Sequence, residues 1–393
     1  MKTLFFFSLT VTYDHPFTSD THMSKFLDYS TDAVLQENTS DAFYEIQYNL
    51  TQLNGIIDTP CLNVSNEDMS DQVLAIFRAL SAALKSIWSN TARFLSAMFG
   101  SVARMRFHTK RLLEKLEDNN NNTHLWTSTL NLEQEIGILS VDDKLPRYPI
   151  DIIRMLDNLL LLSDFYLNEY ATIGNGVLKN LVYETENFNE DDPALSLNEL
   201  NSEVAFLVSR NTPPAFKLTT VSDRRFIGQV WKVCNLPTDK SLFVSRTAVL
   251  DSSNPIARAE SIIANTLTFT DTKELHKTRV SQSGTINTPT LDEMKQMCTL
   301  VLNLCDKIEN YEKIYDEICI NKDKLLDNTE FLVKRLSVGE IPSTDIPYYK
   351  TAIRYNSYIT ASLIQTCTTV SAMVMKVNRS ILVIGNRALA SSE

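Results

Sequence analysis

The stretch QVLAIFRALSAALKSIWSNTARFLSAMFGSVARMRFHTKRLL, residues 72–113, combines two patterns that decide the fold of this chain. Its apolar residues recur at the i, i+3, i+4 and i+7 spacing of a helix, as in Phe77, Leu80, Leu84 and Trp88. The same stretch contains no Asp or Glu, although the whole chain has a formal net charge of -11. The sequence therefore predicts a long amphipathic helix with a basic face.

Seven basic side chains supply that face: Arg78, Lys85, Arg93, Arg104, Arg106, Lys110 and Arg111. One interpretation is a bundle helix whose basic residues meet acidic neighbours elsewhere in the chain. A second is a surface that binds an anionic partner, either a nucleic acid or a membrane. A third is a helix that pairs with another subunit. Charges interrupt the apolar pattern too often for a membrane span, which needs about 20 apolar residues.

Composition indicates the fold class. The 393 residues are 44% hydrophobic and 22% charged, as in an ordinary globular protein, and only nine are Gly, which favours helices over turn-rich sheets. Residues 214–285 differ, because segments such as 226–233 are rich in β-branched and aromatic residues. We expect a mainly α protein, a helical bundle with long helices and a small mixed α/β or β insertion.

Helical periodicity is also strong on either side of the strand-rich block. One apolar helix is predicted from Pro149 to about Tyr183, with a kink at Gly174 or Gly176. Its acidic residues would complement the basic face if the two helices pair; they are Asp151, Asp157, Asp164 and Glu169. Further helical segments are predicted at 291–304, 308–320, 325–336 and 348–384.

These patterns divide the chain into four parts. Residues 1–67 form an acidic N-terminal arm, a candidate targeting segment or propeptide, and residues 68–190 form a helical domain with the basic helix. Residues 191–285 form a mixed strand-containing region, and residues 286–393 form a C-terminal helical region. The arm has nine acidic residues and two lysines, a net charge of -7.

The N-terminus also allows a second class of protein. Lys2 and the apolar residues from Leu4 to Val11 imitate a short signal peptide, although no small-residue cleavage site follows. A secreted or membrane-associated helical interaction protein is therefore an alternative. Translation from Met23 would remove this segment and is a further alternative.

Catalytic and cofactor motifs do not emerge from the sequence. It contains no phosphate-binding glycine loop, nucleophile elbow or zinc signature, and its six cysteines form no C-x-x-C pair. We expect no metal, no cofactor and a reduced environment. Glu184-Thr185-Glu186 and Thr127-Ser128-Thr129 imitate short motifs of ADP-ribosyltransferases. An enzyme of that kind is the second alternative.

Two short triplets provide a more specific clue. Residues 23–37 end in Leu35-Gln36-Glu37, and the acidic arm ends in Ser65-Asn66-Glu67. In these features the chain resembles internal head proteins of large tailed bacteriophages. In the T-even kind, a prohead protease removes a targeting peptide after Glu in [Leu/Ile]-x-Glu; giant phages use Ser-x-Glu. The resemblance implies cleavage after Glu37 or Glu67.

The same resemblance implies a function. It predicts a non-enzymatic virion protein that is packaged inside the capsid and ejected with DNA. The implied partners are other capsid or core proteins, with packaged DNA or a membrane surface as further partners of residues 72–113.

Overall fold

The structure, a computed structural model, describes residues 69–118, 129–132, 134–142, 144–226, 228–246, 253–272, 284–338 and 341–390. Within α2 (Met69–Asp118), the side chains before Trp88, other than that of Lys85, lie outside this description. Long helices and small antiparallel sheets make up the described parts. The predicted fold class, a mainly α bundle with a small strand-containing insertion, is confirmed.

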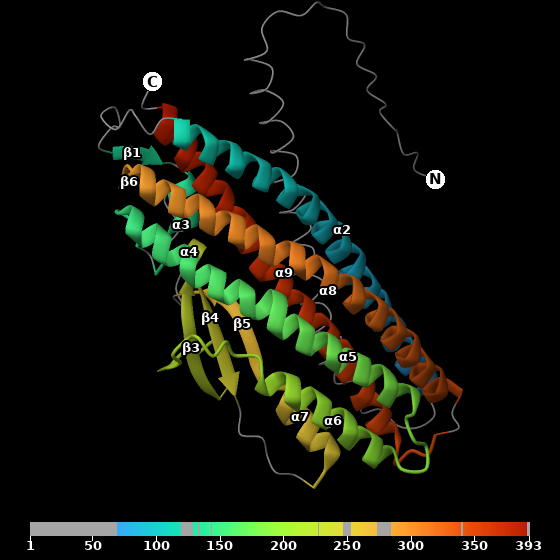
Figure 1. The fold of residues 1–393 in the computed structure, drawn as a ribbon. Helices are drawn as coiled ribbons and strands as arrows, with labels where there is room; N and C mark the ends of the chain where they lie inside the picture. Colours follow the sequence, from blue (N-terminus) through green and yellow to red (C-terminus); the bar gives the residue numbers. More distant parts are fainter. Residues whose placement is uncertain are drawn as a thin grey trace, which may run out of the picture.

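Three long helical segments lie side by side as a layer, with α8 (Leu291–Val338) in the middle (Figure 1). One side of α8 contacts α2, and its other side contacts α4 (Pro149–Asp164) and α5 (Ala171–Glu186). α9 (Ile346–Ala390) packs across the layer against α2, α8 and α5. With 50, 48 and 45 residues, α2, α8 and α9 are each roughly 70 Å long at 1.5 Å per residue.

The apolar periodicity of these helices builds one continuous core from Trp88 to Leu389. The inward positions of α2 are fully or almost fully buried and follow the helical repeat; they are Phe94, Leu95, Met98, Val102, Leu112 and Leu116. Burying such side chains contributes about 1.5–3 kcal/mol each. Three helical segments predicted between residues 291 and 336 form the single helix α8, because its apolar stripe continues without a break.

α4 and α5 form one rod that is interrupted by a π-helical turn, η3 (Phe165–Tyr170). The interruption therefore lies one turn before Gly174, at which the sequence predicts the kink. Tyr166 and Tyr170 are both buried. The Tyr166 hydroxyl donates a hydrogen bond to the carbonyl of Asn211 at 2.9 Å, and its ring meets Phe269 at a centroid distance of 5.8 Å. The wider turn thus connects the helical layer to the sheet.

The sheet is an antiparallel meander in the order β2-β3-β4-β5. It lies entirely within the predicted strand-containing block, and its strands are β2 (Thr219–Val221), β3 (Gln229–Leu236), β4 (Lys240–Arg246) and β5 (Thr266–Asp271). β4 is central and buried, and Leu242 lies opposite Phe269 of β5. The tight turn between β3 and β4 places Thr238 and Asp239 at φ 64° and 54°.

A second, two-stranded sheet joins distant parts of the chain. β1 (Thr129–Leu132) pairs antiparallel with β6 (Gly284–Asn287), and Leu130 lies opposite Ile286. Arg387 of α9 donates a hydrogen bond to the carbonyl of Asn131 at 2.9 Å. A six-residue helix, α3 (Gln134–Leu139), follows β1 and contacts α9.

Two shorter helices cover the lower part of α9 in Figure 1: α6 (Pro193–Ser209) and α7 (Pro255–Ile263). Both begin with proline at the first position, where the missing N–H is not needed. Asp192 and Asn254 cap them by accepting hydrogen bonds from Leu195 and Ile256 at 3.0 and 2.9 Å. The Tyr355 hydroxyl of α9 donates to Asn201 of α6 at 2.5 Å.

α9 is the most enclosed of the long helices. Among the described residues it is the one helix long and apolar enough to cross a membrane, and 67% of its most apolar window is buried in the bundle. Polar side chains interrupt this buried surface. Asn356 donates hydrogen bonds to Thr185 of α5 and Thr329 of α8, at 3.1 and 3.0 Å, and so ties three helices together.

Candidate functional site

The exposed face of α2 carries a group of cationic residues around one exposed aromatic ring. We define the α2 stripe as Arg93, Arg104, Phe107, Lys110, Arg111 and Lys115. All six residues are exposed, and they lie opposite the buried positions of the same helix. From Gln72 to Leu113 the helix has no acidic residue, so next to the α2 stripe acidic side chains occur only from Glu114 onward, at Glu114, Glu117 and Asp118.

Two basic residues of α2 are neutralised by the neighbouring helix. Arg106 Nη2 lies 2.5 Å from Asp306 Oδ1 and 2.8 Å from Glu309 Oε2. Lys85 Nζ lies 2.6 Å from Glu330 Oε1. The hydrogen bond to Asp306 raises the pKa of Arg106, and that to Glu330 raises the pKa of Lys85.

The helix that supplies these acids differs from the one expected. The acidic residues of 151–169 would complement the basic face if their helix paired with α2, but all three partners of Arg106 and Lys85 lie on α8. α8 separates α2 from the α4–α5 rod (Figure 1). Asp164 instead binds Lys307 of α8 at 2.5 Å. Both α2 and the rod therefore use α8 as their electrostatic partner.

Most of the predicted basic face is not neutralised in this way. Arg104, Lys110, Arg111 and also Lys115 form no ion pair with any residue in the described ranges. Arg93 donates a hydrogen bond to the side chain of Asn90 on the same helix. Arg78 lies in the part of α2 whose side chains are outside the description.

Phe107 stands at the centre of the α2 stripe. Its side chain is 61% exposed, one of the largest exposures of a large hydrophobic residue in the described chain. Arg104, Lys110 and Arg111 are three or four residues away, the spacing at which side chains on a helix become neighbours. An apolar ring within a cationic rim suits a partner that offers both anionic groups and an apolar surface.

Phe107 and Lys115 are the members of the α2 stripe that sequence reasoning missed. Phe107 falls on the charged side of the helical repeat, which marks it as exposed rather than buried. Lys115 lies just beyond the end of the acid-free stretch. The candidate cleavage residues Leu35, Gln36, Glu37, Ser65 and Glu67 lie outside the described residues.

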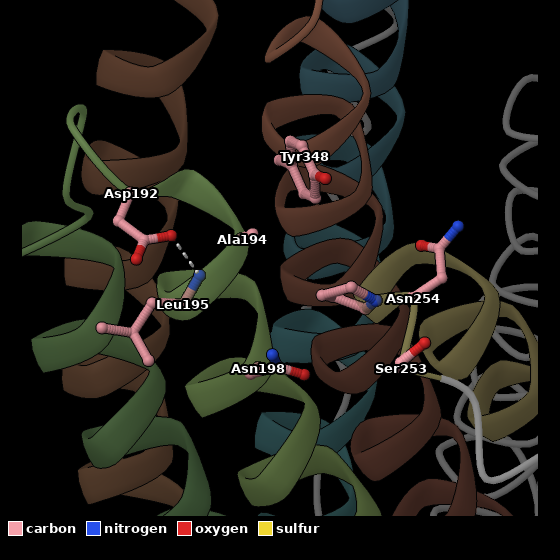
Figure 2. Close-up of a pocket in the computed structure, with 8 residues that line it drawn as sticks. Asp192, Ala194, Leu195, Asn198, Ser253, Asn254 and Tyr348 are labelled. Atoms are coloured by element: carbon pink, nitrogen blue, oxygen red, sulfur yellow. Dashed lines mark hydrogen bonds between the residues drawn. The ribbon is translucent and has the colours of Figure 1, made fainter.

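Two pockets lie in the described part of the molecule. A shallow pocket of about 470 Å³ lies where α6, α7 and α9 begin, and it is lined by residues that include Asp192, Asn254 and Tyr348 (Figure 2). The Asp192 carboxylate is occupied by capping α6. A second pocket of about 970 Å³ is lined by Arg147 and Asp151 among others. Neither pocket contains a cysteine, histidine or paired carboxylate.

The described residues that were candidates for catalysis lie in packed parts of the structure. Thr185 is buried within α5 and accepts a hydrogen bond from Asn356, so the Glu184-Thr185-Glu186 triplet is part of a packed helix. Thr127–Thr129 is mostly outside the description. No group of three metal-binding side chains occurs in the described part of the chain. Burial raises the pKa of the Cys305 and Cys367 thiols to about 12, which keeps them protonated and unreactive.

Comparisons with known proteins identify the family. Residues 59–390 match phiKZ-like phage internal head proteins. No match was found among curated proteins or among solved structures. The family match includes every helix and strand described above and the whole α2 stripe. The chain therefore belongs to the phiKZ-like phage internal head proteins, which lie inside the capsid of the virion.

Proposed function

We propose that this internal head protein binds packaged DNA through the α2 stripe and acts without catalysis. The observation that carries the proposal is that Arg104, Lys110 and Arg111 remain exposed and unpaired within the described chain, although α8 provides acids for Arg106 and Lys85. A bundle that used its basic residues only for internal pairing would bury or neutralise them.

The location favours DNA over other polyanions. A protein inside a phage capsid is surrounded by packaged DNA and by other capsid or core components. Duplex DNA presents one negative charge per about 1.7 Å of its axis, and cationic side chains that replace condensed counterions gain free energy from the release of those ions. The cations from Arg93 to Lys115 span about 33 Å of α2, close to one turn of the duplex.

Binding should be independent of base sequence. Exposed arginines and lysines on one side of a helix contact phosphates, and phosphate contacts carry no direct sequence information. The affinity should therefore fall steeply as the salt concentration rises, by a slope of about -0.9 per neutralised phosphate on a logarithmic plot.

The experiment is a DNA-binding titration of the full chain across a salt series. Charge reversal by R104E, K110E and R111E should reduce the salt slope by about three, since each residue accounts for roughly one released counterion. The control is reversal of both basic residues of the α4–α5 rod, Arg154 and Lys179, which are exposed. Equal affinities of the wild type and the α2 variant, with both chains folded, would contradict the proposal.

A membrane is the second candidate partner, and Phe107 is the residue that favours it. An exposed aromatic ring among cations can enter the interface of a bilayer, where each Lys or Arg adds about 1 kcal/mol of attraction to anionic lipids. Co-sedimentation with phosphatidylserine vesicles separates the two partners. F107S should weaken vesicle binding strongly and DNA binding only slightly.

We further propose that the N-terminal arm is removed in the virion, after Glu37 or Glu67. This proposal rests on the Leu35-Gln36-Glu37 and Ser65-Asn66-Glu67 triplets, and on the family. The family match begins at residue 59, so most of the arm lies outside it.

A further inference from the structure

The charge of the chain is distributed unevenly around the start of α2. Residues 1–67 have nine acidic residues and only two lysines, so they carry -7 of the formal net charge of -11. The arm is joined directly to α2, which has the exposed cations of the α2 stripe. The most acidic and the most exposed basic parts of the chain are therefore neighbours in the sequence.

The arm is long enough to reach the whole α2 stripe. Arg93 and Lys115 are 24 and 46 residues from the first residue of α2, which places them about 36 and 69 Å along the helix. An extended chain advances about 3.3 Å per residue, so about 11 to 21 residues would cover those distances. The acidic residues Asp28, Asp32, Asp41 and Glu45 are all farther than that from Met69 in the sequence, and can reach the stripe without a fully extended path.

The composition of the α2 stripe is complementary to that of the acidic arm. Its four cations without an ion-pair partner in the described chain, Arg104, Lys110, Arg111 and Lys115, lie within three turns of helix. The arm supplies apolar residues for the exposed ring of Phe107, including Phe43 and Ile46, next to Asp41 and Glu45. A segment with both acidic and apolar side chains matches a cationic rim around an aromatic centre.

We propose that the acidic arm docks along the α2 stripe of its own chain and occupies the surface that otherwise binds DNA. The arm then acts as an internal competitor, and its removal exposes the stripe. This inference rests on the proposed function for the identity of the competing ligand. The docking itself can be tested without DNA.

The first experiment detects the contact directly in the full chain. A carbodiimide joins a carboxylate to a lysine amine that is in contact with it, and mass spectrometry then identifies the joined peptides. We expect links from acidic residues of the arm to Lys110 and Lys115. R104E with R111E should abolish these links although both lysines remain, because the reversed charges repel the arm. R154E with K179E should leave the links unchanged.

The same experiment tests whether the arm binds the α2 stripe of a second chain, or does not bind the stripe at all. Links that join two different chains, recognised by mixing isotope-labelled and unlabelled protein, would mean that the arm binds a second copy, and would overturn docking within one chain. Arm links that are absent, or that occur equally at lysines remote from the stripe such as Lys179, would overturn docking altogether.

The second experiment measures competition with DNA. The variant D28N/D32N/D41N/E45Q removes four arm charges and leaves the predicted cleavage residues intact. Its matched control, D157N/E169Q/E186Q/D191N, removes four exposed charges beyond α8, on or next to the α4–α5 rod. The arm variant should bind a 30-base-pair duplex at least about fivefold more tightly than the control, the lower end of typical coupling between two ligands.

The outcomes separate this inference from the proposed function. If both variants bind DNA equally and arm links are absent, the docking inference is wrong while DNA binding stands. If arm links are present and no variant binds DNA, the docking is supported and the proposed function fails. An increase in DNA affinity that is the same for both variants would reflect net charge alone. It would contradict competition between the arm and DNA.

Discussion

Arg106 Nη2 on α2 lies 2.5 Å from Asp306 Oδ1 on α8. Arg104, two residues earlier on the same helix, is instead exposed and has no ion pair with a described residue. The two arginines are alike in sequence context and differ in the neighbour they meet. This difference separates a structural cation from one available to a partner, and it can be tested residue by residue.

Charge reversal should separate the two roles. R106E places a third carboxylate beside Asp306 and Glu309, so we expect it to lower the free energy of unfolding by about 1 kcal/mol, as suits a partly exposed pair. R104E should change stability by less than about 0.5 kcal/mol, but should weaken DNA binding. Urea denaturation and a DNA titration of both variants measure these effects. A stability loss in R104E as large as that in R106E would contradict the assignment.

Two glycines of α5 should respond to alanine with opposite signs. A Cβ on Gly174 would collide with the side chain of Leu363 on α9, whereas a Cβ on Gly176 would meet nothing within 4 Å. G176A should raise the free energy of unfolding by about 1 kcal/mol through helix propensity. G174A should lower it by about 1–3 kcal/mol through overpacking. Stabilisation by both substitutions would mean that α5 and α9 are less closely packed.

Asn356 should contribute more to stability than an exposed asparagine. N356A removes hydrogen bonds to Thr185 and Thr329 and leaves a void between three helices, so we expect a loss of about 1–3 kcal/mol. The control is N180A, which removes an exposed hydrogen bond to Glu203 and should cost less than about 0.5 kcal/mol. Thermal unfolding followed by circular dichroism compares the two.

Glu184 should make stability depend on pH in a defined direction. Burial raises the pKa of its carboxyl, and a hydrogen bond to Glu199 and the negative charges of Glu199 and Glu203 raise it further. A carboxyl with a raised pKa in the folded state loses stability as the pH rises through its titration range. E184Q should therefore be more stable than the wild type at pH 7, and the difference should shrink towards pH 4. E186Q, which removes an exposed carboxylate on the same helix, is the control for the loss of one negative charge.

Maturation of the arm can be checked in particles. If the arm is cleaved, intact-mass spectrometry of the virion-associated protein should find an N-terminus after Glu37 or Glu67. E37Q combined with E67Q should leave the precursor uncut, because the protease pattern requires Glu at the cleaved bond. A full-length chain in mature particles would contradict the proposed removal.

The sequence was sufficient to locate the long helices, although it divided α8 into three segments and predicted neither α6 nor α7. It did not identify which helices are neighbours. Helical periodicity located α2, α8 and α9, because each keeps an apolar stripe for more than 40 residues. Periodicity identifies the buried face of a helix without identifying what covers it. A pairing of α2 with the acidic residues of 151–169 was therefore one interpretation of the sequence, although α8 supplies the real partners.

Local features with weak sequence signals were harder to predict. β1 has four residues and pairs with a strand more than 150 residues away, a distance over which sequence pattern gives no information. A kink was predicted at Gly174 or Gly176, whereas the interruption is a π-helical turn among aromatic residues such as Tyr166, whose ring contacts Phe269 of the sheet. On α2, the basic residues up to Arg111 were predicted and Lys115 was missed, whereas the division into paired and unpaired cations depends on α8.

The order of the long helices has a consequence for biosynthesis. α2 is made early, but the helices that cover its apolar face, α8 and α9, are the last two to be made. About 270 residues separate the end of α2 from the end of α9, which at 5–20 residues per second corresponds to roughly 15–55 seconds of translation. During that interval the ribosome-bound chain holds Trp88, Phe94 and Met98 without their final cover. A nascent chain halted before α9 should therefore depend on chaperones to remain soluble.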